Sequence, residues 1–278
     1  MKTHKPILIT ESNLSVVWAR AFLHVLNSED SGCLTVALRD FSAELPPQDA
    51  EIAQALDAFL KKSEIPTINQ TALTIVPYDR WLRMGKPDLE IIRNWYLGQY
   101  LPRLKARCSK NRHGTYFERL LAYSGIKFKN GHPELKEVNQ LAHVLDIWRK
   151  GLGKGKRPRQ SALQLACFDP AKDHTGSALA GFPCLQQVSL TYKESGTLEI
   201  NAYYPTQYML ERAYGNYLGL CQLGHFIAHQ LGVRLTGFTC FVGNPELGNV
   251  NKSEVATFAA FLTQRLHQLA SAPEAVVN

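Results

Sequence analysis

Residues 181–216 of the 278-residue chain read GFPCLQQVSLTYKESGTLEINAYYPTQYMLERAYGN, and this stretch decides the predicted fold. Residues 185–192 and 197–204 alternate between apolar and polar side chains, as half-buried β-strands do. The KESG segment between them supplies a turn. The apolar run at 209–231 that follows predicts a long buried helix. A cysteine at the start of the first strand is thus followed by two strands and an asparagine near the head of a buried helix.

This order resembles that of the thymidylate synthase and pyrimidine hydroxymethylase superfamily. The resemblance rests on Pro183-Cys184 and on Tyr214-Gly215-Asn216 at the matching distance. It implies an α+β fold in which a thymidylate synthase-like mixed β-sheet packs against helices. Residues 157–270 match best, and the N-terminal half matches faintly. No repeat or linker divides the chain, so a single domain over residues 1–278 is the simpler expectation.

In the resembled family the cysteine attacks C6 of a uracil ring, so Cys184 is the candidate nucleophile. A thiolate suits that step, and it needs nearby positive charge to lower its pKa. Asn216 is the candidate ring reader, because its amide both accepts from N3–H and donates to O4 of uracil. Two other interpretations stay open: Cys184 as a structural thiol and Asn216 as a helix cap.

Further site residues follow from the resemblance. Tyr116, after Gly114, occupies the place of a family tyrosine that enters the active-site cavity, although core packing explains it equally well. Arg157 and Arg159 approximate an arginine pair that holds the nucleotide phosphate across a dimer. A flexible arginine pair suits bidentate phosphate binding, and a solvated loop is the alternative. Gln207 completes the substrate-binding candidates.

Several positions depart from the family pattern. A phosphate-binding arginine and serine are replaced by Pro205 and Thr206, a ring-facing aspartate by Tyr208, and the histidine after the nucleophile by Leu185. The family segment Gly-Asp-x-His-x-Tyr reads GNPELG at 243–248, with Glu246 and Gly248 in place of the histidine and tyrosine. These departures indicate a changed substrate or a lost activity.

Two functions are therefore expected from the resemblance. The first is transfer of a one-carbon unit from a tetrahydrofolate derivative to C5 of a uracil-containing nucleotide, through a covalent Cys184 adduct. The second is a catalytically inactive relative that acts as a nucleotide-binding or interaction module. Either would be a homodimer. Nucleic-acid binding is disfavoured, because the basic residues are not gathered on one element.

Composition narrows the class of protein. A net charge of +7 suits anionic ligands such as nucleotides. The six cysteines contain no Cys-x-x-Cys pair, which argues against a metal site and a disulfide framework. No apolar run is long enough to span a bilayer, and the N-terminus lacks the features of a signal peptide. We therefore expect a cytoplasmic protein without a metal or a membrane partner.

The remaining sequence predicts further helices and strands. An apolar face spaced at helical intervals indicates a helix over 14–26, capped by Ser12 or Asn13. Further helices are expected at 50–62, 88–104, 134–150 and 253–269, and strands at 6–10, 34–38, 73–76, 162–168 and 235–242. Residues 77–81 are expected to form a loop.

Overall fold

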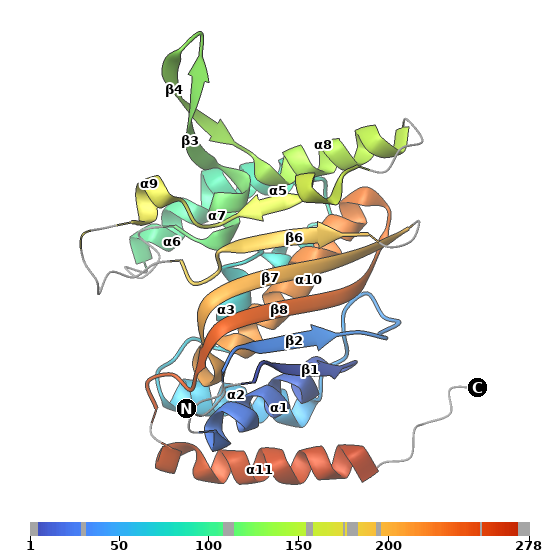
Figure 1. The fold of residues 1–278 in the computed structure, drawn as a ribbon, viewed down its shortest axis with the longest axis vertical. Helices are drawn as coiled ribbons and strands as arrows, with labels where there is room; N and C mark the ends of the chain where they lie inside the picture. The colour runs from blue at the N-terminus through green and yellow to red at the C-terminus, as the bar shows by residue number, and fades with distance from the viewer. Residues whose placement is uncertain are drawn as a thin grey trace.

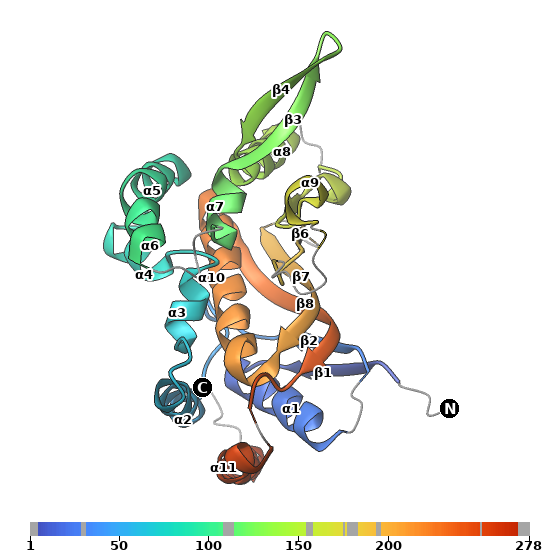
Figure 2. The same ribbon diagram turned by 90° about the vertical axis from the view of Figure 1, so that its left-hand side faces the viewer.

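The structure, a computed structural model, describes residues 5–28, 32–107, 114–153, 158–174, 176, 183–192, 196–250 and 252–271. It confirms the predicted α+β class, because a mixed six-stranded sheet packs against helices (Figure 1). In Figure 2 the helices α10 and α3 form successive layers on one side of the sheet. No described helix is long and apolar enough to cross a membrane.

The sheet has the strand order β1-β2-β8-β7-β6-β5. Its strands are β1 (Ile7–Glu11), β2 (Leu34–Leu38), β5 (Gln164–Ala166), β6 (Gln187–Thr191), β7 (Thr197–Tyr208) and β8 (Arg234–Glu246). The pairs β1–β2 and β7–β8 are parallel, and the other neighbours are antiparallel. Each parallel pair is joined through a helix, as parallel strands require.

Helix α10 (Tyr214–Leu231) connects β7 to β8 and is buried along nearly its whole length. A π-helical segment, η4 (Met209–Ala213), leads directly into it. The side chain of Tyr217 meets Phe238 of β8 with ring centroids 5.5 Å apart. This helix therefore forms the centre of the core, as predicted from a sequence that is apolar on most faces.

Helix α1 (Leu14–Asn27) lies beside α10, and it begins at the predicted cap. The Asn13 side chain accepts hydrogen bonds from the amides of Ser15 at 2.9 Å and Val16 at 3.2 Å. Trp18 is fully buried, and its indole N–H donates to the carbonyl of Met209 at 2.8 Å. One hydrogen bond thus ties the first helix to the segment that introduces α10.

Helix α3 (Ile68–Leu73) packs against α10 through two glycines. A Cβ atom on Gly215 would lie 2.6 Å from Cβ of Thr71 and 2.7 Å from the carbonyl oxygen of Ile68. A Cβ atom on Gly219 would lie 2.9 Å from the carbonyl oxygen of Ala72. The two helices approach so closely because neither position of α10 carries a side chain.

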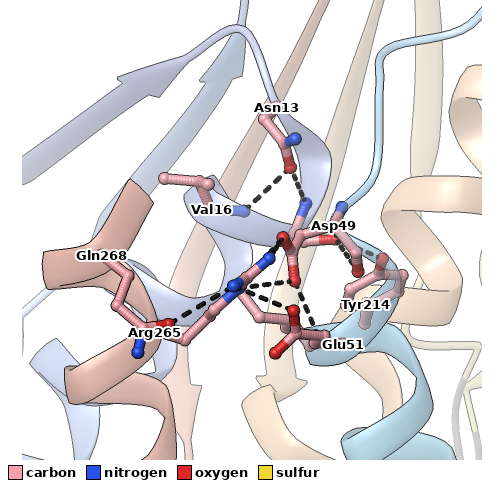
Figure 3. Close-up of polar contacts among 9 residues, drawn as sticks. Asn13, Val16, Asp49, Glu51, Tyr214, Arg265 and Gln268 are labelled. Carbon is pink, nitrogen blue, oxygen red and sulfur yellow. Dashed lines mark hydrogen bonds and ion pairs between the residues drawn. The ribbon is translucent and has the colours of Figure 1, made fainter. Parts of the chain in front are cut away.

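The C-terminal helix α11 (Lys252–Ser271) docks beside α2 (Ala50–Lys62) through an ion pair (Figure 3). Asp49 caps α2 by accepting the amide of Ile52 at 2.9 Å, and Arg265 donates to the same carboxylate at 2.8 Å. Burial alone would raise the pKa of Asp49, but Arg265 and the Ile52 amide outweigh it and hold this pKa below its usual value. The pair fixes the last helix on the domain.

The other elements lie around the β5 end of the sheet (Figure 1). They are α4 (Tyr78–Arg83), α5 (Leu89–Trp95), η1 (Tyr96–Tyr100), α6 (Leu101–Arg107), α7 (Tyr116–Leu121), β3 (Tyr123–Lys129), β4 (His132–Val138), α8 (Gln140–Gly153), η3 (Gln160–Ala162) and α9 (Pro170–Asp173). The β3–β4 hairpin projects from the rest of the domain.

Three local predictions are wrong. Residues 134–138 belong to the hairpin rather than to a helix, since the turn at Asn130 and Gly131 has positive φ angles of 51° and 82°. An Asn-Gly pair is a strong hairpin signal. The strand expected at 73–76 is the end of α3 and a turn, and the loop expected at 77–81 is largely α4.

Candidate functional site

Cys184 precedes β6, and its exposed side chain lies near Tyr116. Tyr116 is the first residue of α7, whose cap, Thr115, accepts the amide of Glu118 at 3.2 Å. The Tyr116 hydroxyl accepts the amide N–H of Leu185 at 3.2 Å, which ties α7 to the segment that carries the cysteine. Two candidates from distant parts of the sequence are thus brought together.

Opposing effects set the protonation of Cys184. Burial of the thiol group raises its pKa, and the positive charge of Arg212 partly offsets this increase. Arg212 belongs to η4 and is half-buried. In the described part of the chain, its guanidinium is committed to no hydrogen bond or ion pair. Arg212 is thus the cation available to a thiolate at Cys184 or to an anionic ligand beside it.

Two tyrosines in this region keep their protons. Burial raises the pKa of Tyr116, and the nearby Cys184 thiol raises it further. Burial also raises the pKa of Tyr204, with smaller contributions from Tyr116 and from neighbouring cysteines. Tyr204 is fully buried, and its hydroxyl finds no hydrogen-bond partner among the described residues. Both hydroxyls therefore remain hydrogen-bond donors at neutral pH.

Gln207 lies at the end of β7 and is only 2% exposed. Its side-chain oxygen accepts the hydroxyl of Tyr217 at 2.9 Å, while its amide nitrogen is buried with no partner in the described structure. A buried polar atom without a partner is costly, so the amide is a candidate donor to a bound molecule.

Asn216 is the third residue of α10 and is 6% exposed. The helix runs on from η4, and its N-cap position is Ala213, so the interpretation of Asn216 as a helix cap is wrong. No hydrogen bond to another described residue occupies its amide. Near the junction of β7 and α10, Asn216 thus offers an uncommitted amide group and Gln207 an uncommitted NH₂ group.

The predicted phosphate-binding arginines are not joined to this site. Arg157 lies outside the described residues. Arg159 is exposed just before η3, and no described hydrogen bond or ion pair holds its side chain. Arg212, which the sequence analysis did not select, is the arginine that acts on Cys184. No sequence motif indicates this role, because Arg212 comes close to Cys184 only through the path of η4 between β7 and α10.

One departure from the family pattern has a structural explanation. Gly248 has a φ angle of +111°, and a Cβ atom there would lie 2.6 Å from the Glu211 carboxylate. Glu211 is 9% exposed and accepts the amide of Asn249 at 2.5 Å. A carboxylate from η4 therefore fills the space beside the residue that replaces the family tyrosine. Glu211 was also missed, because a single glutamate in an apolar segment gives no signal of its role.

Three other departures lie on β7, and a fourth, Leu185, precedes β6. Pro205 is half-buried in β7, and its carbonyl oxygen would be 2.9 Å from a Cβ atom on Gly243 of β8. Thr206 and Tyr208 are also half-buried. Leu185, at the place of the family histidine, is fully buried. These residues are therefore part of the packing of the domain.

Among the described side chains, no cluster of three or more His, Cys, Asp or Glu residues is arranged to hold a metal ion. A comparison with protein-family models found no match for this chain. A search of curated proteins also found no significantly similar sequence. We therefore infer the function from the residues around Cys184.

Proposed function

We propose that the chain is a divergent enzyme of thymidylate synthase type that transfers a one-carbon unit to C5 of a uracil-containing nucleotide. The observation that carries this proposal is the placement of an exposed Cys184 thiol beside the Tyr116 hydroxyl and the Arg212 charge. A nucleophile, a proton donor and a cation are the groups that addition to a uracil ring requires. The reducing cytoplasm suits a reactive thiol.

The chemistry begins when the Cys184 sulfur forms a bond to C6 of the ring. The C5=C6 electron pair then moves toward C5 and O4, which makes C5 a carbon nucleophile. Once C5 has formed a bond to the one-carbon unit, elimination removes the C5 proton and breaks the sulfur–C6 bond, which restores the C5=C6 double bond and returns the thiolate. Arg212 stabilises the thiolate before attack, and Tyr116, which keeps its proton, can donate a hydrogen bond to the sulfur or to the developing negative charge.

Asn216 and Gln207 are the residues proposed to recognise the uracil ring through their amide side chains. The uncommitted amide of Asn216 can accept from N3–H and donate to O4 of uracil. The partnerless nitrogen of Gln207 adds a second donor. Arg212 is the proposed phosphate-binding residue close to Cys184. Arg157 and Arg159 are the candidates to bind the phosphate from a partner subunit.

The one-carbon donor proposed from the resemblance is a tetrahydrofolate derivative. The described residues do not identify a site for a pterin ring. We therefore derive no step through a folate and limit the mechanism to the thiolate addition. The folate part of the proposal is tested separately by measuring the thermal unfolding midpoint of the chain with a nucleotide, in the presence and absence of tetrahydrofolate. A further increase of the midpoint with tetrahydrofolate would indicate that the folate binds.

Trapping of the adduct tests the enzyme function. The wild-type chain is incubated with 5-fluorouracil nucleotides that differ in sugar and phosphate, and intact-protein mass spectrometry follows the product. Addition of the Cys184 thiol across C5=C6, with sulfur on C6 and a proton taken up at C5, should increase the mass by that of one nucleotide, and the electron-withdrawing fluorine at C5 favours this addition. The Cys184→Ala variant should show no increase.

Cys33→Ala is the matched control, because Cys33 is a half-exposed thiol outside this site. It should form the adduct as the wild type does. A mass increase that survives Cys184→Ala, or no increase with any nucleotide, would contradict the proposed enzyme.

A second function, nucleotide binding without catalysis, is favoured by one observation. The net effect of the surroundings raises the pKa of Cys184, which keeps it mostly in the unreactive thiol form. If a uracil nucleotide stabilises the folded chain but no adduct forms, this inactive binding module replaces the enzyme.

We also propose that two copies form a homodimer through the sheet face opposite the helices. In Figure 1 this face is turned to the viewer, and no described helix covers it. Tyr203 and Phe241 on this face are 41% and 40% exposed, and their rings stack with centroids 5.7 Å apart. Exposed apolar surface of this kind is typical of an interface, and the family resemblance indicates a second copy as the partner.

The dimer can be tested by light scattering of the 31.2 kDa chain. The wild type should have twice this mass, and Phe241→Glu should be monomeric, because the carboxylates would be buried between two copies. Leu82→Glu is the control, since Leu82 is 38% exposed on α4. A monomeric wild type, or a dimer that persists in Phe241→Glu, would rule out this interface.

A further inference from the structure

A hollow lies between α2, α3 and α10, and none of the candidate residues around Cys184 lines it. This groove encloses about 510 Å³, which is within the usual size range of small-molecule sites. It is open to solvent on one side. Its lining residues are Leu45, Gln48, Ala53, Gln54, Asp57, Ala58, Lys61, Ile68, Asn69, Leu218 and Gln222.

Gln222 of α10 is the most informative residue of the groove. It is 8% exposed, yet no hydrogen bond with another described residue occupies its amide. An apolar side chain is the usual choice at such a depth in a helix core. Neither of its amide atoms is among the buried side-chain atoms that lack a partner, so the amide reaches the hollow, where it can offer a donor and an acceptor to a bound molecule.

Three other polar residues of the groove, Gln48, Gln54 and Asn69, also carry carboxamides, and the remaining two, Asp57 and Lys61, are charged. The Gln48 oxygen accepts the hydroxyl of Tyr214 at 3.0 Å, which leaves its NH₂ group free to donate. One oxygen of Asp57 accepts the amide of Ile68 at 2.9 Å, and the second remains available. The amides of Gln54 and Asn69 lie on the exposed rim.

The charge of the groove favours a neutral ligand. Lys61 and Asp57 carry opposite charges, so the groove has no net excess of either sign. Leu45, Ala53, Ile68 and Leu218 supply apolar walls against which a flat ring can lie. A phosphate-rich ligand would need several cations, which this groove lacks.

We propose that this groove binds a purine base, free or as a nucleoside, with Gln222 as the residue that reads its edge. A carboxamide pairs with the mixed donor and acceptor edge of a purine through two hydrogen bonds. Several carboxamides around one hollow can serve both edges of a two-ring base. The site is separate from Cys184 and does not depend on the proposed uracil chemistry.

Calorimetric titration of the full chain with adenine, adenosine and uracil tests this proposal. The purines should bind in a saturable manner and uracil more weakly. Gln222→Leu, which removes the amide at similar size, should weaken purine binding about 10-fold or more. Ala58→Trp, on the exposed wall of the groove, should abolish binding by filling the hollow without changing the core.

Gln99→Leu is the matched control, because Gln99 is an exposed glutamine of η1 outside the groove. It should bind as the wild type does, and so should Cys184→Ala if the two sites are independent. The proposal is overturned if neither purine binds. It is also overturned if affinity survives both Gln222→Leu and Ala58→Trp, or if Cys184→Ala removes it.

Discussion

Replacing Gly215 by alanine is expected to lower the free energy of unfolding by about 2–3 kcal/mol. The new Cβ atom would lie 2.6 Å from Thr71 and 2.7 Å from the backbone oxygen of Ile68. Because a backbone oxygen cannot turn away as a side chain can, α3 must shift off α10. This cost exceeds the gain of up to about 1 kcal/mol that alanine normally brings to a helix.

Urea denaturation of the two proteins measures this difference. Gly98→Ala is the matched control, since a Cβ atom at this glycine of η1 would meet no atom within 4 Å. The control should leave the unfolding midpoint unchanged or slightly higher. If Gly215→Ala were as stable as Gly98→Ala, the close contact between α3 and α10 would be wrong.

Replacing Arg212 by glutamine is expected to slow adduct formation at Cys184 on the order of 100-fold. Arg212 opposes the effect of burial on the thiol, so its loss moves the pKa of Cys184 further upward. A smaller fraction of thiolate is then present at neutral pH, and an anionic nucleotide also loses the nearest positive charge. Both effects act in the same direction.

Two measurements separate these effects. Iodoacetamide labelling of the Cys184 peptide, followed by mass spectrometry over a pH series, reports the thiolate alone, and its midpoint should move to higher pH in Arg212→Gln. Adduct formation with a 5-fluorouracil nucleotide reports both effects. Arg159→Gln is the control for labelling, because Arg159 is exposed and does not influence the Cys184 pKa. An unchanged labelling profile in Arg212→Gln would remove Arg212 from the site.

Local patterns in the sequence predicted the elements that form the core. Apolar residues at helical spacing predicted α1, and Asn13 caps it as expected. Alternation predicted β6 and β7, and the apolar run after them predicted the buried helix α10. These elements were predictable because the spacing of their apolar residues indicates which face of each element packs against the core. The β3–β4 hairpin was missed because the helical pattern of α8 was extended backwards over residues 134–138 of β4, and the Asn130-Gly131 turn signal before them was not used.

By itself, then, the sequence determined the α+β class and the order of a cysteine, two strands and a buried helix. The tertiary structure decided which side chains surround that cysteine. Tyr116 lies beside the cysteine because its hydroxyl accepts the Leu185 amide, and Arg212 is brought near it by η4. Neither contact can be predicted from a local sequence pattern, since each joins residues that are distant in the sequence. The groove lined by Gln222 likewise depends on the tertiary structure, because α2, α3 and α10 are brought together there from separate parts of the sequence.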